Sequence, residues 1–177
     1  MDERAKIVVC PTSDLGPITE ILALMDAAFE GDFDPEDWDH AVGGIHAVAV
    51  VDGRVCGHAS VVPRTLWIGE RQLDGGYVEA VAVLPEHQGK GIGTAVMRAL
   101  GPAIAGHQIG ALSTGEHHFY ERRGWKRWRG RTWVRTANGL VRTEDEDDGI
   151  MVLRTPLSPT FSLESDIVCE DRPGDAW

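Results

Sequence analysis

Residues 76–93 read GYVEAVAVLPEHQGKGIG, and this stretch decides the fold that we expect for the chain. Residues 77–84 form an apolar run interrupted by Glu79, which is typical of a central strand buried on both faces. The glycine-rich segment after it opens a helix expected over residues 92–105. Glycines there permit positive φ angles and close approach of a ligand to the backbone. Successive N–H groups at a helix start favour a phosphate, and Lys90 adds a cation.

Two common phosphate-binding patterns do not fit this loop. The dinucleotide pattern GxGxxG fails because Thr94, not glycine, stands three residues after Gly91. The Walker pattern fails because the chain contains no GK followed by Ser or Thr. On the loop alone, an ordinary glycine-rich turn remains an open alternative.

Further elements are expected on both sides of this stretch. Asp52-Gly53 lies between two β-branched apolar runs and predicts a hairpin of residues 46–52 and 54–62. A strand–loop–helix–strand order in the middle of the chain predicts a mixed α/β domain. The other expected elements are strands at 6–10, 108–113 and 150–154, a second hairpin turning near 68–70, and a short helix at 115–123.

Two helices are expected near the N-terminus. The first covers residues 17–30, with Pro17 in its first turn. Its apolar side chains fall on one face at helical spacing: Ile18, Ile21, Leu22, Met25 and Phe29. Asp34 followed by Pro35 predicts the start of the second helix, with Asp34 as its N-cap.

Composition bounds the class of protein. With 177 residues, of which 42% are hydrophobic, we expect one domain over residues 1–177, in which 155–177 form a polar C-terminal arm. Seventeen basic and 28 acidic residues give a net charge of −11, which disfavours nucleic-acid binding and favours a cationic small molecule.

Several absences in the sequence lead to further expectations. No apolar run approaches the ~18 residues of a membrane helix, and no secretory leader is recognisable, so we expect a cytoplasmic protein without membrane contact. Cys10, Cys56 and Cys169 are far apart and fit a reducing compartment. Neither HxH nor HExxH occurs, so we expect no metal.

The stretch 76–93 resembles the signature of the GNAT superfamily of N-acetyltransferases, in which an apolar strand precedes Q/R-x-x-G-x-G/A and a helix. This resemblance implies an α/β (α+β) fold with a central mixed, mostly antiparallel twisted sheet flanked by helices and splayed at the acetyl-CoA site. It further implies that loop amides hold the pyrophosphate of acetyl-CoA and that the preceding strand offers backbone groups to the pantetheine arm. The implied cofactor-binding residues are Val81, Ala82, Val83, Gln88, Gly89, Lys90, Gly91, Ile92 and Gly93.

A narrower set of blocks resembles the aminoglycoside 2'-N-acetyltransferases. The blocks are Phe29-Glu-Gly-Asp-Phe33, Asp37-Trp38, Gly43-Gly44-Ile45-His46, Gly76-Tyr77-Val78-Glu79, Gly110-Ala111-Leu112-Ser113, Arg123-Gly124-Trp125 and Gly174-Asp175-Ala176-Trp177. One departure is that the segment between Ser113 and Tyr120 is shorter than in that family. The resemblance implies acetylation of the 2'-amine of aminoglycoside antibiotics, which confers resistance. Direct attack in a ternary complex is expected because no cysteine lies at the implied acyl site.

The two implied catalytic residues are Glu79 and Tyr120. Acetyl transfer from a thioester to an amine requires removal of a proton from the amine and neutralisation of the leaving thiolate. Glu79 is implied as the general base, acting through water. The simpler alternative is that its side chain lies on a solvent-exposed face of the strand. Tyr120 is implied as the proton donor to the thiolate, and the alternative is a tyrosine half-buried by its ring.

The implied substrate site is acidic, as a polyamine requires. Its residues are Asp32, Asp37, Glu79, Ala80 through its backbone, Ser113, Asp147, Asp175 and Trp177 through its terminal carboxylate. Asp37 has an alternative role, because it stands three residues after Asp34 and would complete a capping pair. Residues 144–148 are by default a solvated acidic loop, from which Asp147 or, next, Asp148 is implied to reach the ligand.

Two other functions stay open at this point. A GNAT enzyme of this kind could acetylate another amine, such as a cell-wall amino sugar or a protein N-terminus. A non-catalytic module that binds aminoglycoside or CoA is the alternative outside the enzymes. The sequence does not determine the oligomeric state, and a homodimer is one open possibility.

Overall fold

The computed structural model describes residues 5–16 and 18–177, which form two compact units. Unit 1 comprises the chain up to Val62 together with Val78–Ala103, and unit 2 comprises Pro63–Tyr77 together with Ile104–Trp177. Two long strands, β3 (Arg54–Ile68) and β4 (Arg71–Val83), contribute residues to both units. The expectation of a single domain stays a prediction, and the role expected of Pro17 lies outside the described residues.

Unit 1 contains an antiparallel sheet in which β2 (Ile45–Val51) pairs with both β1 (Lys6–Pro11) and β3. The turn from β2 to β3 has Asp52 and Gly53 at φ angles of 49° and 79°. Positive φ at both central residues suits a two-residue hairpin turn whose twist matches the strands. The hairpin predicted around Asp52-Gly53 is therefore confirmed.

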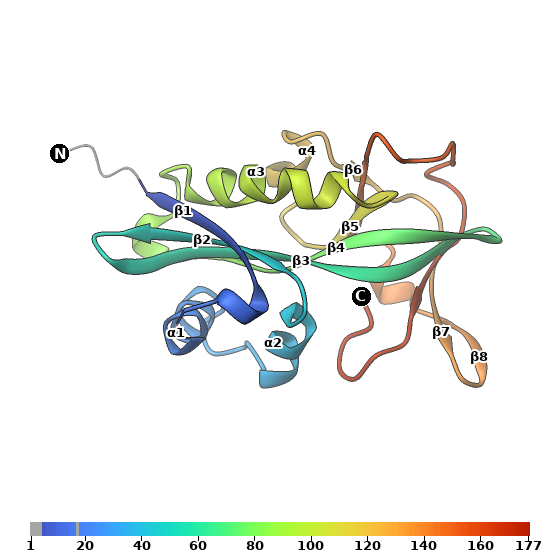
Figure 1. Ribbon diagram of the computed structural model, residues 1–177. Helices are drawn as coiled ribbons and strands as arrows, with labels where there is room; N and C mark the ends of the chain where they lie inside the picture. The colour runs from blue at the N-terminus through green and yellow to red at the C-terminus, as the bar shows by residue number, and fades with distance from the viewer. Residues whose placement is uncertain (1–4, 17) are drawn as a thin grey trace. The chain divides into compact units, whose positions relative to one another are not determined.

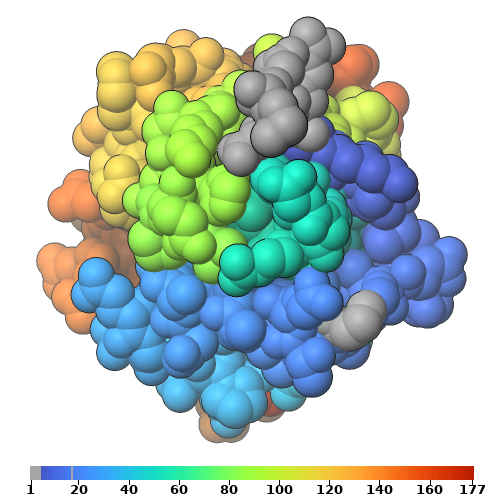
Figure 2. Space-filling view, turned by 90° about the vertical axis from the view of Figure 1, so that its left-hand side faces the viewer, coloured from blue at the N-terminus to red at the C-terminus, as the bar shows by residue number. Residues whose placement is uncertain are grey.

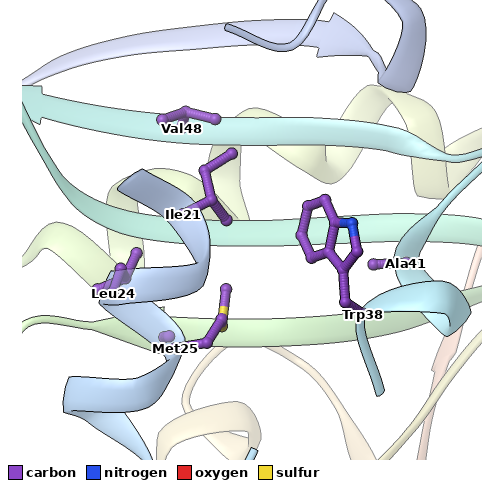
Figure 3. Close-up of a cluster of buried hydrophobic side chains, with 7 residues drawn as sticks. Ile21, Leu24, Met25, Trp38, Ala41 and Val48 are labelled. Atoms are coloured by element: carbon purple, nitrogen blue, oxygen red, sulfur yellow. The ribbon is translucent and has the colours of Figure 1, made fainter. Parts of the chain in front are cut away.

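Two helices cover one face of this sheet, and α3 (Ile92–Ala105) lies on the opposite face (Figure 1). The first two are α1 (Ile18–Ala28) and α2 (Pro35–Ala41), and α2 begins after the predicted N-cap Asp34. Both helices contribute to one buried cluster of the core (Figure 3), which consists of Ile21, Leu24, Met25, Trp38, Ala41, Val48 and Ala82.

Only part of the predicted apolar face of α1 is buried. Ile21 and Met25 are buried as predicted, and Leu24 is buried with them. The exposed fraction is 38–40% for Ile18, Leu22 and Phe29. The prediction is wrong for Ile18 and Leu22 because α1 contacts the sheet along a narrow stripe at spacings of three and four residues, and flanking side chains stay in solvent. Phe29 lies beyond Ala28, where α1 ends, and its ring stacks on that of Phe33.

The start of α3 lies close to β3. A Cβ atom on Gly57 would lie 2.6 Å from Cγ2 of Ile92 and 3.3 Å from Cβ of Ala49. Glycine at this position therefore lets the first turn of α3 approach the sheet. Figure 2 shows the same end of unit 1, where the light-green segment that leads into α3 lies beside the teal turn between β2 and β3.

Unit 2 contains a mixed sheet with the strand order β6-β9-β5-β4-β3-β10-β7-β8. Its further strands are β5 (Ile109–Ser113), β6 (Lys126–Arg127), β7 (Thr132–Thr136), β8 (Gly139–Arg142), β9 (Ile150–Arg154) and β10 (Ile167–Glu170). The pairs β4–β5 and β10–β7 are parallel, and β5–β9, β6–β9, β7–β8 and β10–β3 are antiparallel. The mixed, mostly antiparallel sheet predicted for the chain is confirmed.

Short helices complete the chain. They are α4 (His117–Glu121) and three 3-10 turns, η1 (Thr12–Asp14), η2 (Pro85–His87) and η3 (Glu144–Glu146). Among the helices of the described chain, none has the length and apolar character required to cross a membrane.

The C-terminal segment contains a strand that the sequence did not predict. Residues 155–177 are expected as a polar arm, but β10 lies within them and pairs with both β3 and β7. Ile167, Val168 and Cys169 of β10 are buried. So short an apolar run shows no periodicity of its own, and pairing with distant strands decides its structure.

β4 is less buried than its apolar sequence predicts. Tyr77 and Val78 are buried, whereas residues 79–81 are half-exposed. The parallel pairing of β4 with β5 runs from Gly75 to Tyr77, although β4 continues to Val83. This early end of the ladder fits the expected splay of the sheet.

Candidate active site

The glycine-rich loop joins β4 to α3 in unit 1. Gly89 and Gly91 have φ angles of 73° and 85°, which residues with a Cβ atom rarely adopt. Residues 88–91 are exposed. The N–H groups in the first turn of α3 have no partner within the helix. The loop therefore presents backbone donors beside the Lys90 ammonium, an arrangement that suits a phosphate group.

β4 has a local break at Ala80, whose φ angle is 50°. Two side chains of β3 bind consecutive carbonyls there. Ser60 Oγ donates to the carbonyl oxygen of Glu79 at 3.2 Å, and His58 Nδ1 donates to that of Ala80 at 2.7 Å. Because consecutive carbonyls of a regular strand point to opposite neighbours, this arrangement interrupts the ladder as a bulge does. The half-buried residue Glu79 lies at the break.

Two fully buried histidines support this break. The distance from His46 Nδ1 to His58 Nε2 is 2.9 Å, and that from Thr12 Oγ1 to His46 Nε2 is 2.7 Å. Burial lowers the pKa of each histidine to about 4, so both rings are neutral at pH 7. The ring of Trp38 packs against both, with centroid distances of 5.8 and 5.7 Å.

The predicted substrate residues Asp32 and Asp37 lie before and within α2. The backbone N–H of Asp34 donates to Asp37 Oδ2 at 2.9 Å, and the Asp34 side chain accepts from the backbone N–H of Asp37. The capping pair considered for Asp37 is therefore confirmed, and this residue stabilises the helix start. Asp32 is exposed in the turn before the helix, and Asp37 is half-exposed.

In unit 2, Asp147 is bound by neighbouring side chains. Arg142 forms an ion pair with its carboxylate, in which Nη1 lies 2.7 Å from Oδ1. The backbone N–H and the hydroxyl of Thr132 both donate to Oδ1 at 2.9 Å. The hydrogen bond from Arg142 lowers the pKa of Asp147 to about 2. This carboxylate thus has a structural role, whereas the adjacent Asp148 is exposed.

Ser113, at the end of β5, also contacts the acidic segment. Its hydroxyl donates to Glu146 Oε2 at 3.1 Å. The segment approaches closely here, because a Cβ atom on Gly149 would lie 3.0 Å from Ser113 Oγ. The predicted residue Ser113 therefore contacts the acidic loop in which Asp147 lies.

The C-terminal residues are held in place. The indole Nε1 of Trp177 donates to Thr143 Oγ1 at 3.0 Å, and the ring is 7% exposed. The hydroxyl of Thr143 in turn donates to Thr132 Oγ1 at 2.9 Å. Because Thr132 also binds Asp147, hydrogen bonds connect two of the predicted substrate residues, Trp177 and Asp147. Asp175 is exposed.

Arg64 anchors the same segment. Its guanidinium is buried, with Nη1 donating to the carbonyl oxygen of Ala176 at 2.6 Å and Nη2 to that of Glu170 at 2.7 Å. The guanidinium also lies over the ring of Tyr77, 4.9 Å from its centroid. The Arg64 guanidinium thus makes two charge-assisted hydrogen bonds and one cation–π interaction.

Tyr120 of α4 is almost fully buried. Its ring makes edge contacts with Phe119 and Trp125, at centroid distances of 4.9 and 5.9 Å. Burial raises the pKa of the phenol above its ordinary value. The hydroxyl therefore keeps its proton at neutral pH.

Sequence reasoning missed His46, His58, Arg64 and Arg142. The two histidines carry a signal in the sequence, because each lies within an apolar, β-branched run, as Glu79 does. Arg64 carries no local signal, because its partner Ala176 is 112 residues away. Arg142 lies five residues before Asp147, but the sequence offers several acidic residues in that run and does not indicate which one it binds. Within residues 5–16 and 18–177, no group of three or more His, Cys, Asp and Glu side chains is placed to hold a metal ion.

Comparisons with known proteins bear on the chemistry. A family model described as "Acetyltransferase (GNAT) domain" matches residues 43–127, which include the glycine-rich loop and the break in β4. A curated protein of Mycolicibacterium fortuitum, named aminoglycoside 2'-N-acetyltransferase, is 42% identical over 173 residues. The match covers 94% of this chain and 89% of that protein.

Solved structures share the fold. The GNAT family N-acetyltransferase YhbS of Escherichia coli, in complex with CoA, aligns with a TM-score of 0.67 at 18% identity and covers 96% of this chain and 91% of its own. A GNAT family acetyltransferase of Brucella melitensis, in complex with acetyl-CoA, gives a TM-score of 0.62 at 22% identity over 93% and 95%. Longer solved chains match too, and this chain spans 33–35% of their length.

Proposed function

Because this chain belongs to the aminoglycoside 2'-N-acetyltransferase family of GNAT acetyltransferases, we propose that it transfers the acetyl group of acetyl-CoA to the 2'-amine of aminoglycoside antibiotics and so confers resistance. The observation that carries the proposal is the 42% identity to an aminoglycoside 2'-N-acetyltransferase over 94% of the chain. The net charge of −11 supports it, because aminoglycosides are polycations.

The proposed acetyl-CoA site is the loop from Gln88 to Gly93 with the preceding strand residues Val81–Val83. Positive φ angles at Gly89 and Gly91 shape an exposed loop, and its amides are proposed to bind the pyrophosphate. Lys90 adds a positive charge beside it. The strand residues lie past the end of the β4–β5 ladder, and we expect their backbone groups to bind the pantetheine arm there. The carbonyl oxygen of Val83 already accepts from the Gln88 side chain at 3.2 Å, so that contact would have to give way to a ligand.

Glu79 is the proposed general base. Its half-buried position at the break of β4 suits a carboxylate that accepts a proton through one water molecule. A carboxylate there also favours binding of the amine as ammonium before the proton is removed. Loss of that proton gives the nitrogen the lone pair with which it attacks the thioester carbonyl.

Tyr120 is the proposed donor to the departing thiolate. Its raised pKa keeps the phenol protonated, as a donor must be. A phenol at its ordinary pKa is already a weaker acid than a thiol of pKa ~8.5, and the raised pKa of Tyr120 widens the difference. We therefore assign it a hydrogen bond that stabilises the developing thiolate, with complete proton transfer coming from solvent afterwards.

Carboxylates are proposed to bind the remaining ammonium groups of the drug. Asp32, Asp37, Asp175 and the terminal carboxylate of Trp177 are the candidates, and Ser113 and the Ala80 backbone are proposed to bind hydroxyl groups. Asp147 is already paired with Arg142, so an ammonium there competes with a guanidinium. The exposed Asp148 is for this reason the better ligand within the acidic run.

A thiol-release assay over a panel of amines tests the proposal. Release of free CoA in the presence of drugs that carry a 2'-amine, and little with drugs that carry a 2'-hydroxyl, is the expected result. Release of CoA with an amino sugar or a peptide N-terminus, but not with aminoglycosides, would contradict the proposed substrate. The assignment as an acetyltransferase would still hold. Tight aminoglycoside binding without any release would indicate a binding module.

A further inference from the structure

Ala80 has a backbone conformation that is unfavourable for a residue with a Cβ atom. A φ angle of 50° is common for glycine and uncommon for a residue with a Cβ atom. Such a conformation persists where the surrounding structure holds it, and it is frequent at functional sites. Ala80 directly follows Glu79, so whatever holds Ala80 also fixes the backbone that carries the proposed general base.

The contact that holds Ala80 comes from His58. Its Nδ1 lies 2.7 Å from the carbonyl oxygen of Ala80, and a carbonyl oxygen only accepts hydrogen bonds. Nδ1 of His58 therefore carries a proton. In the neutral ring Nε2 must then be the acceptor, and His46 Nδ1 lies 2.9 Å from it.

The same reasoning fixes the second ring. If His46 Nδ1 donates to His58, then His46 Nε2 accepts, and the Thr12 hydroxyl lies 2.7 Å away. That hydroxyl accepts from the backbone N–H of Gly43 at 2.9 Å. Its own proton has two acceptors within reach, the carbonyl oxygen of Gly44 at 3.3 Å and His46 Nε2 at 2.7 Å, and the shorter contact assigns it to His46. The donors thus run in one direction, from Thr12 through both histidines to Ala80.

A proton wire does not explain this chain of hydrogen bonds, because it ends on a backbone carbonyl, which does not exchange protons at neutral pH. The series of hydrogen bonds instead fixes the orientation of the His58 ring. A single imidazole could rotate, whereas one whose far nitrogen is bound by a second fixed imidazole is held in one tautomer and one direction. Trp38 packs against both rings and restricts them further.

We propose that His58, oriented by His46, is a positioning residue for acetyl transfer, because it holds the Ala80 carbonyl and thereby the break of β4 that aims Glu79 and the backbone of residues 81–83. The kinetic part of this inference rests on the proposed function above. The competing explanation is that the two histidines only fill the core, in which case an apolar side chain of similar size serves equally well.

The first test uses the unaltered protein. Two-bond ¹H–¹⁵N NMR spectra of the imidazoles distinguish the Nδ1–H tautomer, the Nε2–H tautomer and the charged ring. We expect both His46 and His58 as neutral Nδ1–H tautomers at pH 7. An Nε2–H tautomer or a charged ring at either position overturns the inference, whether or not the protein is an enzyme.

The second test compares two substitutions at one position. His58→Asn keeps a donor as many bonds from Cα as Nδ1, whereas His58→Leu removes it and retains apolar bulk. We expect His58→Leu to lower kcat about 10- to 100-fold, the range for a small misplacement of catalytic groups. The KM for acetyl-CoA should change little, because the loop 88–93 keeps its own geometry. His58→Asn should restore most of kcat.

A matched control and a second readout keep the result unambiguous. His118→Asn, on the exposed side of α4, should leave kcat unchanged. The backbone resonances of residues 79–81 should shift in His58→Leu and return towards normal in His58→Asn. Equal kcat values and unshifted resonances in His58→Leu would overturn the inference. If the unaltered protein acetylates no aminoglycoside, the proposed function fails, and the resonances and tautomers alone decide the inference.

Should His58→Leu not fold, Ala80→Gly provides the same information. Glycine adopts a φ angle of 50° without strain, so the double variant His58→Leu, Ala80→Gly should fold where His58→Leu does not. A double variant that is no more stable than His58→Leu would show that His58 does not act through Ala80, and would overturn the inference.

Discussion

The guanidinium Nη1 of Arg64 lies 2.6 Å from the carbonyl oxygen of Ala176, although 112 residues separate the two in the sequence. Nη2 of the same side chain binds the carbonyl oxygen of Glu170. One buried cation thus fixes the chain on both sides of Asp175, a residue that we assign to the substrate. Residues that a terminus would normally leave mobile acquire a defined position in unit 2.

Replacement of Arg64 should therefore weaken binding of the drug. Arg64→Leu removes the guanidinium donor from two carbonyl oxygens, of which that of Ala176 keeps only the weak thiol donor of Cys169 at 3.4 Å. Each lost hydrogen bond should reduce the free energy of unfolding by about 1–3 kcal/mol. Titration calorimetry should show weaker aminoglycoside binding and nearly normal acetyl-CoA binding. Arg129→Leu is the control, because Arg129 is exposed and its ion pair with Glu164 has a distance of 3.5 Å. Unchanged aminoglycoside affinity in folded Arg64→Leu would contradict the role assigned to Arg64.

Gly91→Val should raise the KM for acetyl-CoA strongly. The φ angle of Gly91 is 85°, which a β-branched residue does not adopt without strain of about 1–3 kcal/mol. The loop must change shape, and its amides then no longer face the pyrophosphate. Gly16→Ala, at an exposed glycine of unit 1 with open space around its Cβ position, is the control. Steady-state kinetics check the prediction, and an unchanged KM in a folded variant places the cofactor elsewhere.

Glu79→Gln should reduce kcat much more than it weakens drug binding. Gln is similar in size but cannot accept the amine proton, and loss of a general base lowers rates by about 10²–10⁴-fold. The measurement is kcat at pH 7 together with calorimetric aminoglycoside affinity. A loss of affinity that accounts for the whole effect would make Glu79 a binding residue only.

The histidine pair predicts how stability depends on pH. Burial lowers the pKa of His46 and His58 to about 4, below the 6.5 of an exposed histidine. As the pH falls from about 6.5 to about 4, the unfolded chain gains protons that the folded chain does not, so stability is lost in this range. Each histidine contributes a slope of up to about 1.4 kcal/mol per pH unit.

Urea unfolding at several pH values between 7.5 and 4.5 measures that slope. His58→Leu should show a shallower slope than the unaltered protein, whatever its absolute stability. Asp147 does not confuse the result, because its pKa is lowered to about 2 and its contribution is lost only below its ordinary value of 3.8. Equal slopes in the two proteins would mean that His58 is not buried as a neutral ring.

Local patterns predicted much of unit 1. The Asp52-Gly53 turn, the Asp34 cap and the start of α3 each depend on residues within a few positions of one another. Such signals act through local backbone preference, and the structure confirms them. The apolar face of α1 was predicted less well, because the breadth of its contact depends on the sheet below.

Unit 2 was harder to predict because its contacts join distant segments. β10 pairs with β3 and β7, whose residues lie tens of positions away, and its four residues show no period. Arg64 binds the carbonyl oxygen of Ala176, 112 residues away in the sequence. Arg142 binds Asp147 only five residues away, but the fold of the loop between them decides which carboxylate of the acidic run it contacts. The resemblance named Asp147 and Trp177, but the hydroxyls of Thr132 and Thr143 that join them are evident only in the folded chain.

The position of the acetyl group on the product is the most direct test of the central claim. The protein should be incubated with acetyl-CoA and an aminoglycoside that carries several amines, and the product examined by mass spectrometry and two-dimensional NMR. An enzyme holds only one nitrogen near the thioester, so a single product is expected. The account predicts one acetyl group, on the 2'-nitrogen. Acetylation at any other amine, or no acetylated drug at all, would contradict it.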